Sequence, residues 1–577
     1  MTAGTLAGGR TGCASRSPSA AYAAHVTTPN TTSPADTIAA AYATPEPALV
    51  LGAVVVDGTA SPTSPVQVPL SMLNRHGLVA GATGTGKTKT LQVMSEQLSA
   101  AGVPVFLADV KGDLSGIVAP GQPSDRITRR AAEIGDDWQP AGFPVQFLSL
   151  GDDGRGAPVR TTITSFGPQL LAKVLGLNDV QGSSLSLVFH YADNAGLPLL
   201  DLKDLRAVIQ HLTSDAGSAE LEQLGGLSTA TAGVILRELI GFADSGADKF
   251  FGEPELDTAE LLTTTQDGKG IVTVLELIGV QEQPALFSTF LMWMLADLFH
   301  DLPEVGDLDK PKLVFFFDEA HLLFDGASKE FLASVAQTVR LIRSKGVGVF
   351  FVTQLPTDVP REVLAQLGNR VQHALRVFTP EDAKALASTV STFPRSKVYD
   401  LAELLPALGI GEALVTVLRE NGAPTPVAWT RLRPPRSLMA QLDAAEQSRL
   451  VAASPLMAEY GQAIDRESAY ERLLGRVGGG GVGGGGVGGA GTEPAGAAPA
   501  APGPHEAGNP GAMTPPMQPP PKPAASDDHE SGVGDKVGEV LGSPAFRAFS
   551  RSVGSALGRE ITRSLFGTAR RSPRRRR

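Results

Sequence analysis

Residues 81–88 read Gly-Ala-Thr-Gly-Thr-Gly-Lys-Thr, so three glycines precede a lysine and a hydroxyl side chain. Glycines let backbone N–H groups turn inward around an anion, and a helix that starts there adds free donors. The run fits the phosphate-binding pattern G-x-x-x-x-G-K-[ST] and lies between an apolar segment and a helical pattern over 89–98. We expect Lys87 to reach the β- and γ-phosphates of a nucleotide and Thr88 to bind Mg²⁺. The expected phosphate-binding residues are Gly81, Thr83, Gly84, Thr85, Gly86, Lys87 and Thr88.

A second run joins an apolar strand to two acids, since residues 313–321 read Leu-Val-Phe-Phe-Phe-Asp-Glu-Ala-His. Acids at the end of a buried strand complement a phosphate-binding loop. We expect Asp318 to hold Mg²⁺ through water and Glu319 to polarise the attacking water. Asp-Glu-Ala-His also occurs in helicases with two tandem cores, but the rest of this chain has no room for a second core.

Other polar residues near strand ends complete the predicted site. Gln354 ends an apolar run, where its amide would sense the γ-phosphate and position water. Asp109 ends the strand that follows the loop, and its role is either a contact that supports the site or the cap of a turn. His321 and His373 are expected to be structural, and the sequence holds no Cys/His cluster that predicts a zinc site.

Arginines are further candidates, because an arginine from a neighbouring subunit can stabilise charge in phosphoryl transfer. Arg340 and Arg343 lie three apart on one predicted helix, and Arg370 and Arg376 follow further along the chain. We rank Arg343 and Arg370 first as catalytic residues, because each lies just before a predicted strand.

The elements that must position these residues alternate between short aliphatic runs and helical patterns. Such alternation predicts βαβ units and a mainly parallel sheet, and almost continuous apolar runs indicate strands covered on both faces. The predicted fold class is therefore α/β, with helices flanking the sheet. The predicted strands are 77–80, 105–109, 145–148, 271–275, 313–318, 347–353, 374–378 and 413–418.

The domain organisation follows from changes in composition along the chain. Residues 1–45 are of low complexity and are predicted to be a disordered tail, and 46–475 have globular composition and are predicted to form the domain that carries the phosphate-binding loop. Within it, about 150–268 is expected to be a mostly helical insertion, with helical segments at 169–175, 184–192, 200–212 and 231–242. Residues 476–530 form a linker rich in Gly, Pro and Ala.

Charge is unevenly distributed. The chain carries a formal net charge of −11 and is not a generally basic nucleic-acid binder, yet residues 531–577 hold 11 Lys/Arg against 3 Asp/Glu. A single cysteine, Cys13, excludes an internal disulfide framework, and no apolar run is long enough to span a bilayer. A cytoplasmic location is therefore expected.

The basic end has a helical pattern. Over 544–567 the apolar residues recur every three or four positions, with arginines elsewhere on the wheel, and an arginine tail follows. Three interpretations stay open for this amphipathic helix. It grips nucleic-acid phosphates, lies on an anionic membrane surface, or docks its apolar face on this protein or a neighbour.

Five segments of the core follow a recognisable pattern, namely Asn74–Thr88, Val105–Gly116, Lys312–Phe324, Arg340–Val349 and Gln366–Arg376. Together they resemble the YjgR-type bacterial family of HerA-helicase-like P-loop ATPases, and the resemblance covers roughly 47–475. It implies a RecA-like core of the HerA/FtsK type, with ATP and Mg²⁺ as cofactors and with Asp318, Glu319 and Gln354 in ATPase roles. Relatives with this core form hexameric rings and translocate DNA with arginine fingers that reach across subunits. Unlike HerA, this chain shows no N-terminal β-barrel pattern.

The favoured function is therefore an ATP-hydrolysing, homo-oligomeric motor that acts on DNA as a translocase or helicase. The alternative is a P-loop ATPase that acts on protein or membrane-associated cargo. A nucleotide-binding switch with slow turnover fits less well, because a pure binder needs neither Glu319 nor Gln354. The sequence contains no Asn-Lys-x-Asp guanine reader, which favours ATP.

Overall fold

The computed structural model describes residues 33–151, 155–223, 226–278, 284–306, 308–325, 327 and 329–479. The predicted basic helix at 544–567, almost all of the linker and most of the N-terminal tail lie outside these residues. Among the helices of the described segments, none combines the length and the apolar character that a membrane span requires.

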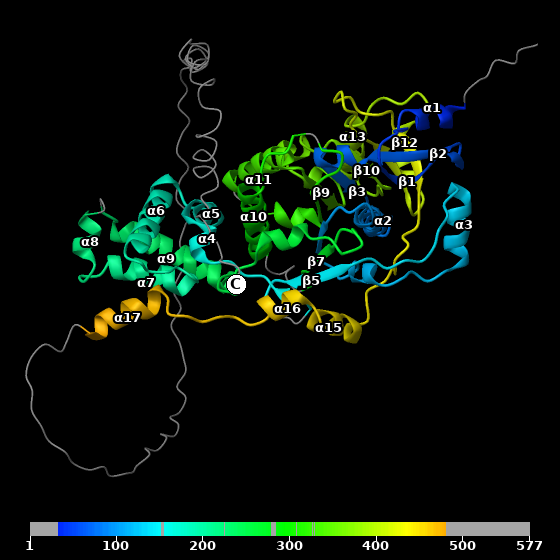
Figure 1. The fold of residues 1–577 in the computed structure, drawn as a ribbon. Coiled ribbons are helices and arrows are strands. Elements are labelled where there is room, and N and C mark those ends of the chain that lie inside the picture. The colour runs from blue at the N-terminus through cyan, green and yellow to red at the C-terminus, as the bar shows by residue number, and fades with distance from the viewer. Residues whose placement is uncertain are drawn as a thin grey trace, which may run out of the picture.

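One twelve-stranded sheet organises the described part of the chain, in the order β2-β1-β12-β11-β10-β3-β9-β8-β4-β7-β5-β6 (Figure 1). Neighbouring strands are parallel from β10 to β6 and antiparallel from β2 to β10. The parallel strands are β3 (Gly77–Ala80), β4 (Val105–Asp109), β5 (Val145–Ser149), β6 (Ala157–Pro158), β7 (Val272–Glu276), β8 (Leu313–Phe317), β9 (Val347–Thr353) and β10 (Asn369–Gln372). The antiparallel strands are β1 (Ala48–Val56), β2 (Thr59–Pro69), β11 (Glu412–Thr416) and β12 (Ala428–Leu432).

The mainly parallel α/β sheet is thus confirmed, with differences in single strands. The predicted strand at 374–378 is wrong, because the strand in this region is β10, which ends at Gln372. The sequence patterns also missed β1, β2 and β12. Strand β2 contains Pro62 and Pro65, which a strand tolerates at the edge of a sheet because one side of its backbone makes no ladder bonds.

Both faces of the parallel strands are covered, as their apolar runs predict. Every residue of β8 is buried. Phe315 and Phe317 stack on one face with an interplanar angle of 6°, while Phe316 packs against Phe350 on the other. Because side chains alternate along a strand, the run of three phenylalanines supplies both hydrophobic layers.

Helices form these layers. Helix α2 (Lys87–Ala100) packs on one face through Leu91, Met94 and Leu98, and α10 (Pro284–Asp301) and α11 (Lys329–Ile342) pack on the other. The remaining helices of the core are α3 (Asp125–Ile134), α12 (Arg361–Leu364), α13 (Pro380–Ser391), α14 (Leu401–Ala407), α15 (Ala444–Ala452) and α16 (Pro455–Tyr460).

Part of the predicted disordered tail is ordered. Residues Pro34–Ala40 form α1, and Ile38 and Tyr42 are buried in the layer that α2 also joins. The Tyr42 hydroxyl donates to the Val415 carbonyl oxygen at 2.7 Å. This contact ties the segment to β11, so the tail prediction is wrong for these residues.

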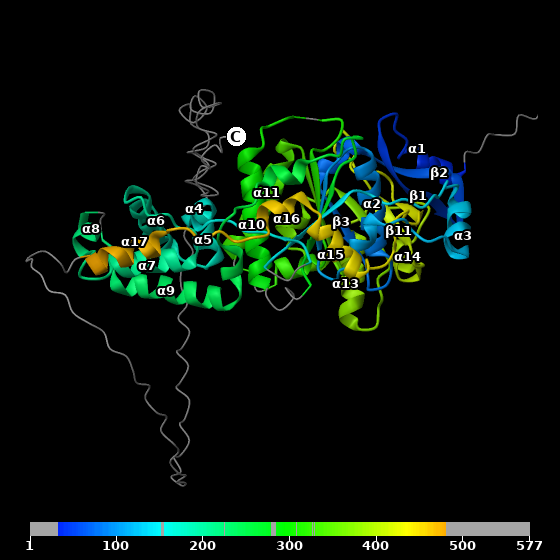
Figure 2. The ribbon, with the colours of Figure 1, turned by 60° about the horizontal axis from the view of Figure 1, so that its bottom comes forward.

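Between β6 and β7 the chain forms a helical unit that lies beside the sheet (Figures 1 and 2). Helix α17 (Ala469–Gly479) returns from the other end of the core and packs against α7, where the Tyr470 N–H donates to Asp204 at 2.9 Å. The unit therefore contains residues from beyond the segment 150–268 that the sequence assigns to the insertion. Its other helices are α4 (Ile163–Phe166), α5 (Pro168–Val174), α6 (Asp179–Asn194), α7 (Leu202–Leu212), α8 (Ser218–Gln223) and α9 (Thr229–Asp244).

Candidate functional site

The loop between β3 and α2 needs its glycines. Gly81, Gly84 and Gly86 have φ angles of 152°, 77° and 115°, in the region that side chains disfavour. A Cβ atom on Gly81 would also lie 2.5 Å from the Cβ of His373. Glycine adopts these three backbone conformations without strain, whereas any other residue at positions 81, 84 or 86 would be strained.

Neighbouring strands hold this loop in place. The Gly81 N–H donates to the Gln354 carbonyl oxygen at 3.1 Å, at the end of β9. The Ala82 N–H donates to the Ala374 carbonyl oxygen at 2.8 Å, just after β10. Both anchors lie at the carboxyl ends of parallel strands, the edge where ligands bind in such sheets.

Lys87 begins α2 and turns its ammonium back toward the loop. Its Nζ donates to the Gly81 carbonyl oxygen at 2.6 Å, and the side chain is buried. Burial lowers the pKa of Lys87, while the nearby charges of Glu319 and Asp318 oppose this shift. The cation thus lies inside the loop, where an anion would meet it. Thr88, next on the helix, is half-buried.

Asp318 and Glu319 follow β8, which is separated from β3 only by β9. Both carboxylates are buried. Burial and the charge of Glu319 raise the pKa of Asp318 to about 7. Glu319 has a φ of 47°, a left-handed conformation that turns the chain sharply out of the strand.

Two basic side chains lie beside the Glu319 carboxylate, and Lys111 makes a hydrogen bond to it. The Lys111 ammonium, two residues beyond β4, donates to Oε1 of Glu319, and Nδ1 of His321 lies 3.3 Å from Oε2. Burial lowers the pKa of Lys111, but the hydrogen bond and charge of Glu319 outweigh it and leave the pKa raised. Sequence reasoning assigned no role to Lys111, although a lysine just after the carboxyl end of a strand was a usable signal.

The residues present fit a magnesium ion. Thr88 and Asp318 offer the hard oxygen ligands that Mg²⁺ prefers. Oε2 of Glu319 is buried and makes no hydrogen bond among the described residues. Two adjacent buried carboxylates are costly to ionise together, and a cation beside them would offset that cost.

Gln354 is exposed directly after β9, between the strands that carry the loop and the acidic pair. Its carbonyl oxygen already contacts Gly81. Asp109 caps a turn: its Oδ1 accepts from the Gly112 N–H at 2.8 Å and its Oδ2 from the Leu114 N–H at 2.7 Å. Of the two roles considered for Asp109, these bonds favour the cap.

The two arginines ranked first do not reach the loop of their own chain. Arg343 precedes β9 and therefore lies at the opposite edge of the sheet from Gln354. Arg370 lies inside β10, in register with Leu78, and not just before a strand as predicted. Its neighbour Val371 packs in the layer of α2, so Arg370 faces the other side.

His373 lies against Gly81 of the loop and against the first turns of α2. It is fully buried, and its Nε2 lies 2.9 Å from the Thr90 hydroxyl of α2. Burial and the charge of Lys87 lower the pKa of His373 to about 3, so the ring is neutral at ordinary pH. This environment agrees with a structural role.

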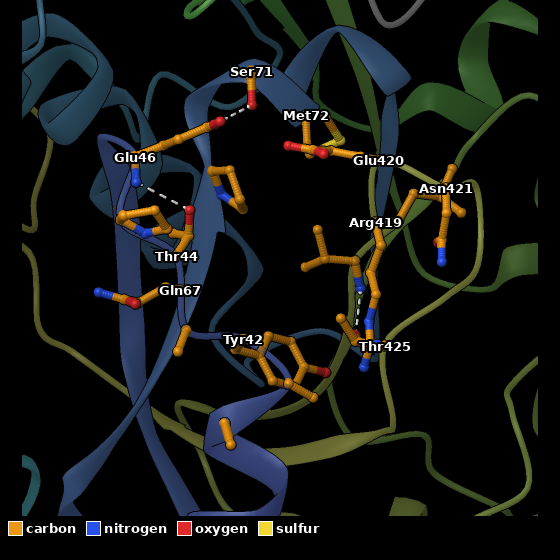
Figure 3. Close-up of a pocket in the computed structure, with 17 residues that line it drawn as sticks. Tyr42, Thr44, Glu46, Gln67, Ser71, Met72, Arg419, Glu420, Asn421 and Thr425 are labelled. Atoms are coloured by element: carbon orange, nitrogen blue, oxygen red, sulfur yellow. Dashed lines mark hydrogen bonds between the residues drawn. The ribbon is translucent and has the colours of Figure 1, made fainter.

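A cavity of about 480 Å³ lies elsewhere, between the α1–β1 and β11–β12 connections (Figure 3). Met72, which precedes β3 in the chain, is one of its lining residues. The cavity therefore lies at the sheet edge opposite the loop. The charged residues of its lining are Glu46, Glu420 and Arg419, so the lining has no excess of positive charge that would attract phosphate. The phosphate-binding loop and this cavity are separate features.

Comparison with known proteins gives a family match. The family model described as helicase HerA-like C-terminal matches residues 56–576. The chain is 21% identical over 353 residues to the DNA double-strand break repair helicase HerA of Saccharolobus solfataricus, covering 61% of this chain and 63% of that protein. It is 20% identical over 352 residues to the protein of that name from Sulfolobus acidocaldarius, covering 61% and 64%. The chain thus spans less than two thirds of the length of these curated relatives.

Solved structures give weaker likenesses. The plasmid coupling protein TrwB in complex with the ATP analogue ADPNP is 17% identical, with a TM-score of 0.47, covering 71% of this chain and 94% of that chain. VirB4 of Thermoanaerobacter pseudethanolicus is 15% identical, with a TM-score of 0.43, covering 67% and 96%.

Proposed function

The chain belongs to the helicase HerA-like C-terminal family, and from this premise we propose that it hydrolyses ATP with Mg²⁺ to drive a motor acting on DNA. One observation carries the proposal. The loop at 81–88, the acidic pair Asp318 and Glu319, and Gln354 converge at the carboxyl ends of the neighbouring strands β3, β9 and β8.

Each residue has a distinct role in the proposed reaction. The backbone N–H groups of the loop and the Lys87 ammonium bind the β- and γ-phosphates. Glu319 accepts a hydrogen bond from the attacking water and aligns it with the γ-phosphorus, while the Gln354 amide contacts that phosphate. Mg²⁺ on Thr88 and Asp318 would neutralise charge on the phosphate oxygens.

A homo-oligomer, such as a hexamer, completes the site in this proposal. Arg343 lies at the sheet edge opposite the loop, and Arg370 faces the layer opposite α2, so either would act on the nucleotide of a neighbouring subunit. A DNA substrate is supported by the helicase names of the curated relatives. We place the motor in the cytoplasm.

The alternative is an ATPase that moves protein or membrane-associated cargo. The amphipathic arginine-rich pattern of residues 531–577 favours it, because such a segment also binds anionic lipid surfaces.

ATP turnover with and without single- and double-stranded DNA, over a range of salt concentrations, separates the two functions. A DNA motor should turn over faster with DNA, and the gain should shrink with salt. Flat turnover, together with liposome binding that is lost on deleting 531–577, would support the alternative. Normal hydrolysis by Lys87→Ala or Glu319→Gln would contradict both, and a mass measurement with ATP tests the oligomer.

A further inference from the structure

Two apolar side chains are exposed on segments that contact the start of α2 and the loop before it. Ile410, in the loop between α14 and β11, is 54% exposed, and Met439, in the segment after β12, is 37% exposed. We propose that Ile410 and Met439 form the two sides of a subsite for the purine base of the nucleotide. This inference rests on the proposed function, because the base is placed by phosphates bound at residues 81–88.

The backbone of Ile410 is fixed against the phosphate-binding loop. The N–H of the next residue, Gly411, donates to the Thr85 carbonyl oxygen at 2.9 Å. A Cβ atom on Gly86 would lie 3.3 Å from the Gly411 nitrogen, so the two chain segments are in close approach. Ile410 is therefore one residue from a direct contact with the loop.

A second contact holds Ile410 from behind. Arg130 of α3 donates from Nη2 to the Ile410 carbonyl oxygen at 3.0 Å and from Nη1 to the Gly411 carbonyl oxygen at 2.9 Å. A loop pinned by a guanidinium on one side and by the phosphate-binding loop on the other cannot turn its apolar side chain inward at low cost. The exposure of Ile410 is thus built into the fold.

Met439 is held against the first turns of α2. Nζ of Lys89 donates to the Met439 carbonyl oxygen at 2.9 Å, and Nε2 of Gln92 donates to the Leu438 carbonyl oxygen at 2.8 Å. The anchors of the two apolar side chains are Thr85, in the loop just before α2, and Lys89, in the first turn of α2. Figure 2 shows α2, α3, α14 and β11 gathered in this part of the core.

This arrangement suits a purine. With phosphates at the amino end of α2, the sugar and base would extend beside the first helical turn, which contains Lys89. A flat base gains most from apolar surface on both faces, and a methionine sulfur makes favourable contacts with aromatic rings. The branched side chain of Ile410 is stiff and gives the base a second, fixed wall.

Calorimetric titration in the presence of Mg²⁺ tests the subsite with two probes. The probes are ADP and inorganic tripolyphosphate. The double variant Ile410→Ala/Met439→Ala should bind ADP about tenfold or more weakly. Tripolyphosphate has no base, so its affinity should stay within about twofold. Ile464, 55% exposed on the segment that pairs with Glu253, supplies the matched control Ile464→Ala, which should bind both probes like the wild type.

Two results would overturn the subsite. Unchanged ADP affinity in the double variant would show that no base contacts these side chains, and equal weakening of both probes would show damage to the loop itself. A wild-type protein that binds neither probe would instead contradict the proposed nucleotide site, which is a different result from unaltered ADP binding by the variant.

Discussion

The Lys111 ammonium donates a hydrogen bond to Oε1 of Glu319, so a cation from the end of β4 holds the carboxylate that is proposed to orient water. His321 approaches the other oxygen of the same carboxylate. Lys111 therefore makes the hydrogen bond that orients the Glu319 carboxylate, although the backbone of Glu319 has left the strand.

Replacing Lys111 with Met, which keeps the length of the side chain without its charge, removes this orientation. We expect kcat for ATP to fall by about tenfold or more, because the carboxylate no longer has a fixed direction. The phosphates do not contact Lys111 in the proposed site, so KM should change by less than about threefold. Steady-state kinetics measure both, and Lys111→Arg should recover part of kcat. Unchanged kcat in Lys111→Met would contradict the positioning role.

The loop glycines give a second prediction. Gly84 has a φ of 77° with open space around it, and Gly176 in the helical unit has a φ of 62°, also with open space. Alanine at either position should cost about 1 kcal/mol of unfolding free energy, from backbone strain alone. Only Gly84→Ala should also weaken ADP binding, because only that residue lies in the loop. Denaturant unfolding and ADP titration of the two variants check this, and equal ADP binding would count against the loop.

Gly81 should tolerate replacement by alanine less well than Gly84 or Gly176. Its φ of 152° and the close approach of the His373 Cβ act together on any side chain placed there. Gly81→Ala should therefore lose clearly more stability than Gly84→Ala in the same denaturant series. The reverse order would mean that His373 moves aside easily.

The sequence predicts those parts of the site whose residues are close together in the chain, and it misses contacts between residues far apart in the chain. The loop and the acidic pair are contiguous motifs, and placing each at a strand end is enough to bring them to one edge. The contact of Lys111 with Glu319 joins residues 208 positions apart and depends on β4 lying beside β8. No local pattern contains that adjacency.

Strand β10 shows a second limit. Its residues, Asn369–Gln372, are mostly polar and lack a strand pattern, while the more apolar residues just after them attracted the prediction. The strand forms because it fills the position between β3 and β11, where both neighbours bond to it. Tertiary pairing here overrides local propensity. The shift also changed the setting of Arg370, from the start of a predicted strand to the interior of a real one.

Stability should depend on pH through Asp318. Burial and the charge of Glu319 raise the pKa of this carboxyl to about 7 in the folded protein, above its ordinary value of 3.8. Between about pH 4 and 7 the folded chain keeps a proton that the unfolded chain has released, so its unfolding free energy falls as pH rises through this window. Asp318→Asn should lack this fall. Denaturant unfolding without Mg²⁺ measures the difference, and parallel pH profiles for the two proteins would contradict it.

Replacing Arg370 should change stability and ATP turnover in opposite directions. Burial lowers the pKa of its guanidinium, and Nη1 makes no hydrogen bond to any described residue. A half-buried cation with an unpaired Nη1 costs stability, so Arg370→Met, which fills similar space, should raise the unfolding free energy by about 1 kcal/mol. If a neighbouring subunit places its nucleotide against Arg370, the same change should lower turnover of the assembled protein by about a hundredfold or more.

The matched control for this prediction is Arg376→Met. Arg376 is exposed and donates to the Pro406 carbonyl oxygen at 2.9 Å, so its loss should leave stability and turnover close to those of the wild type. Thermal unfolding and ATP turnover of both variants are the measurements. A more stable Arg370→Met with normal turnover would remove Arg370 from the reaction and leave Arg343 as the first-ranked arginine to test, followed by Arg340. A less stable variant would mean that the guanidinium has compensating contacts and that its burial is structural.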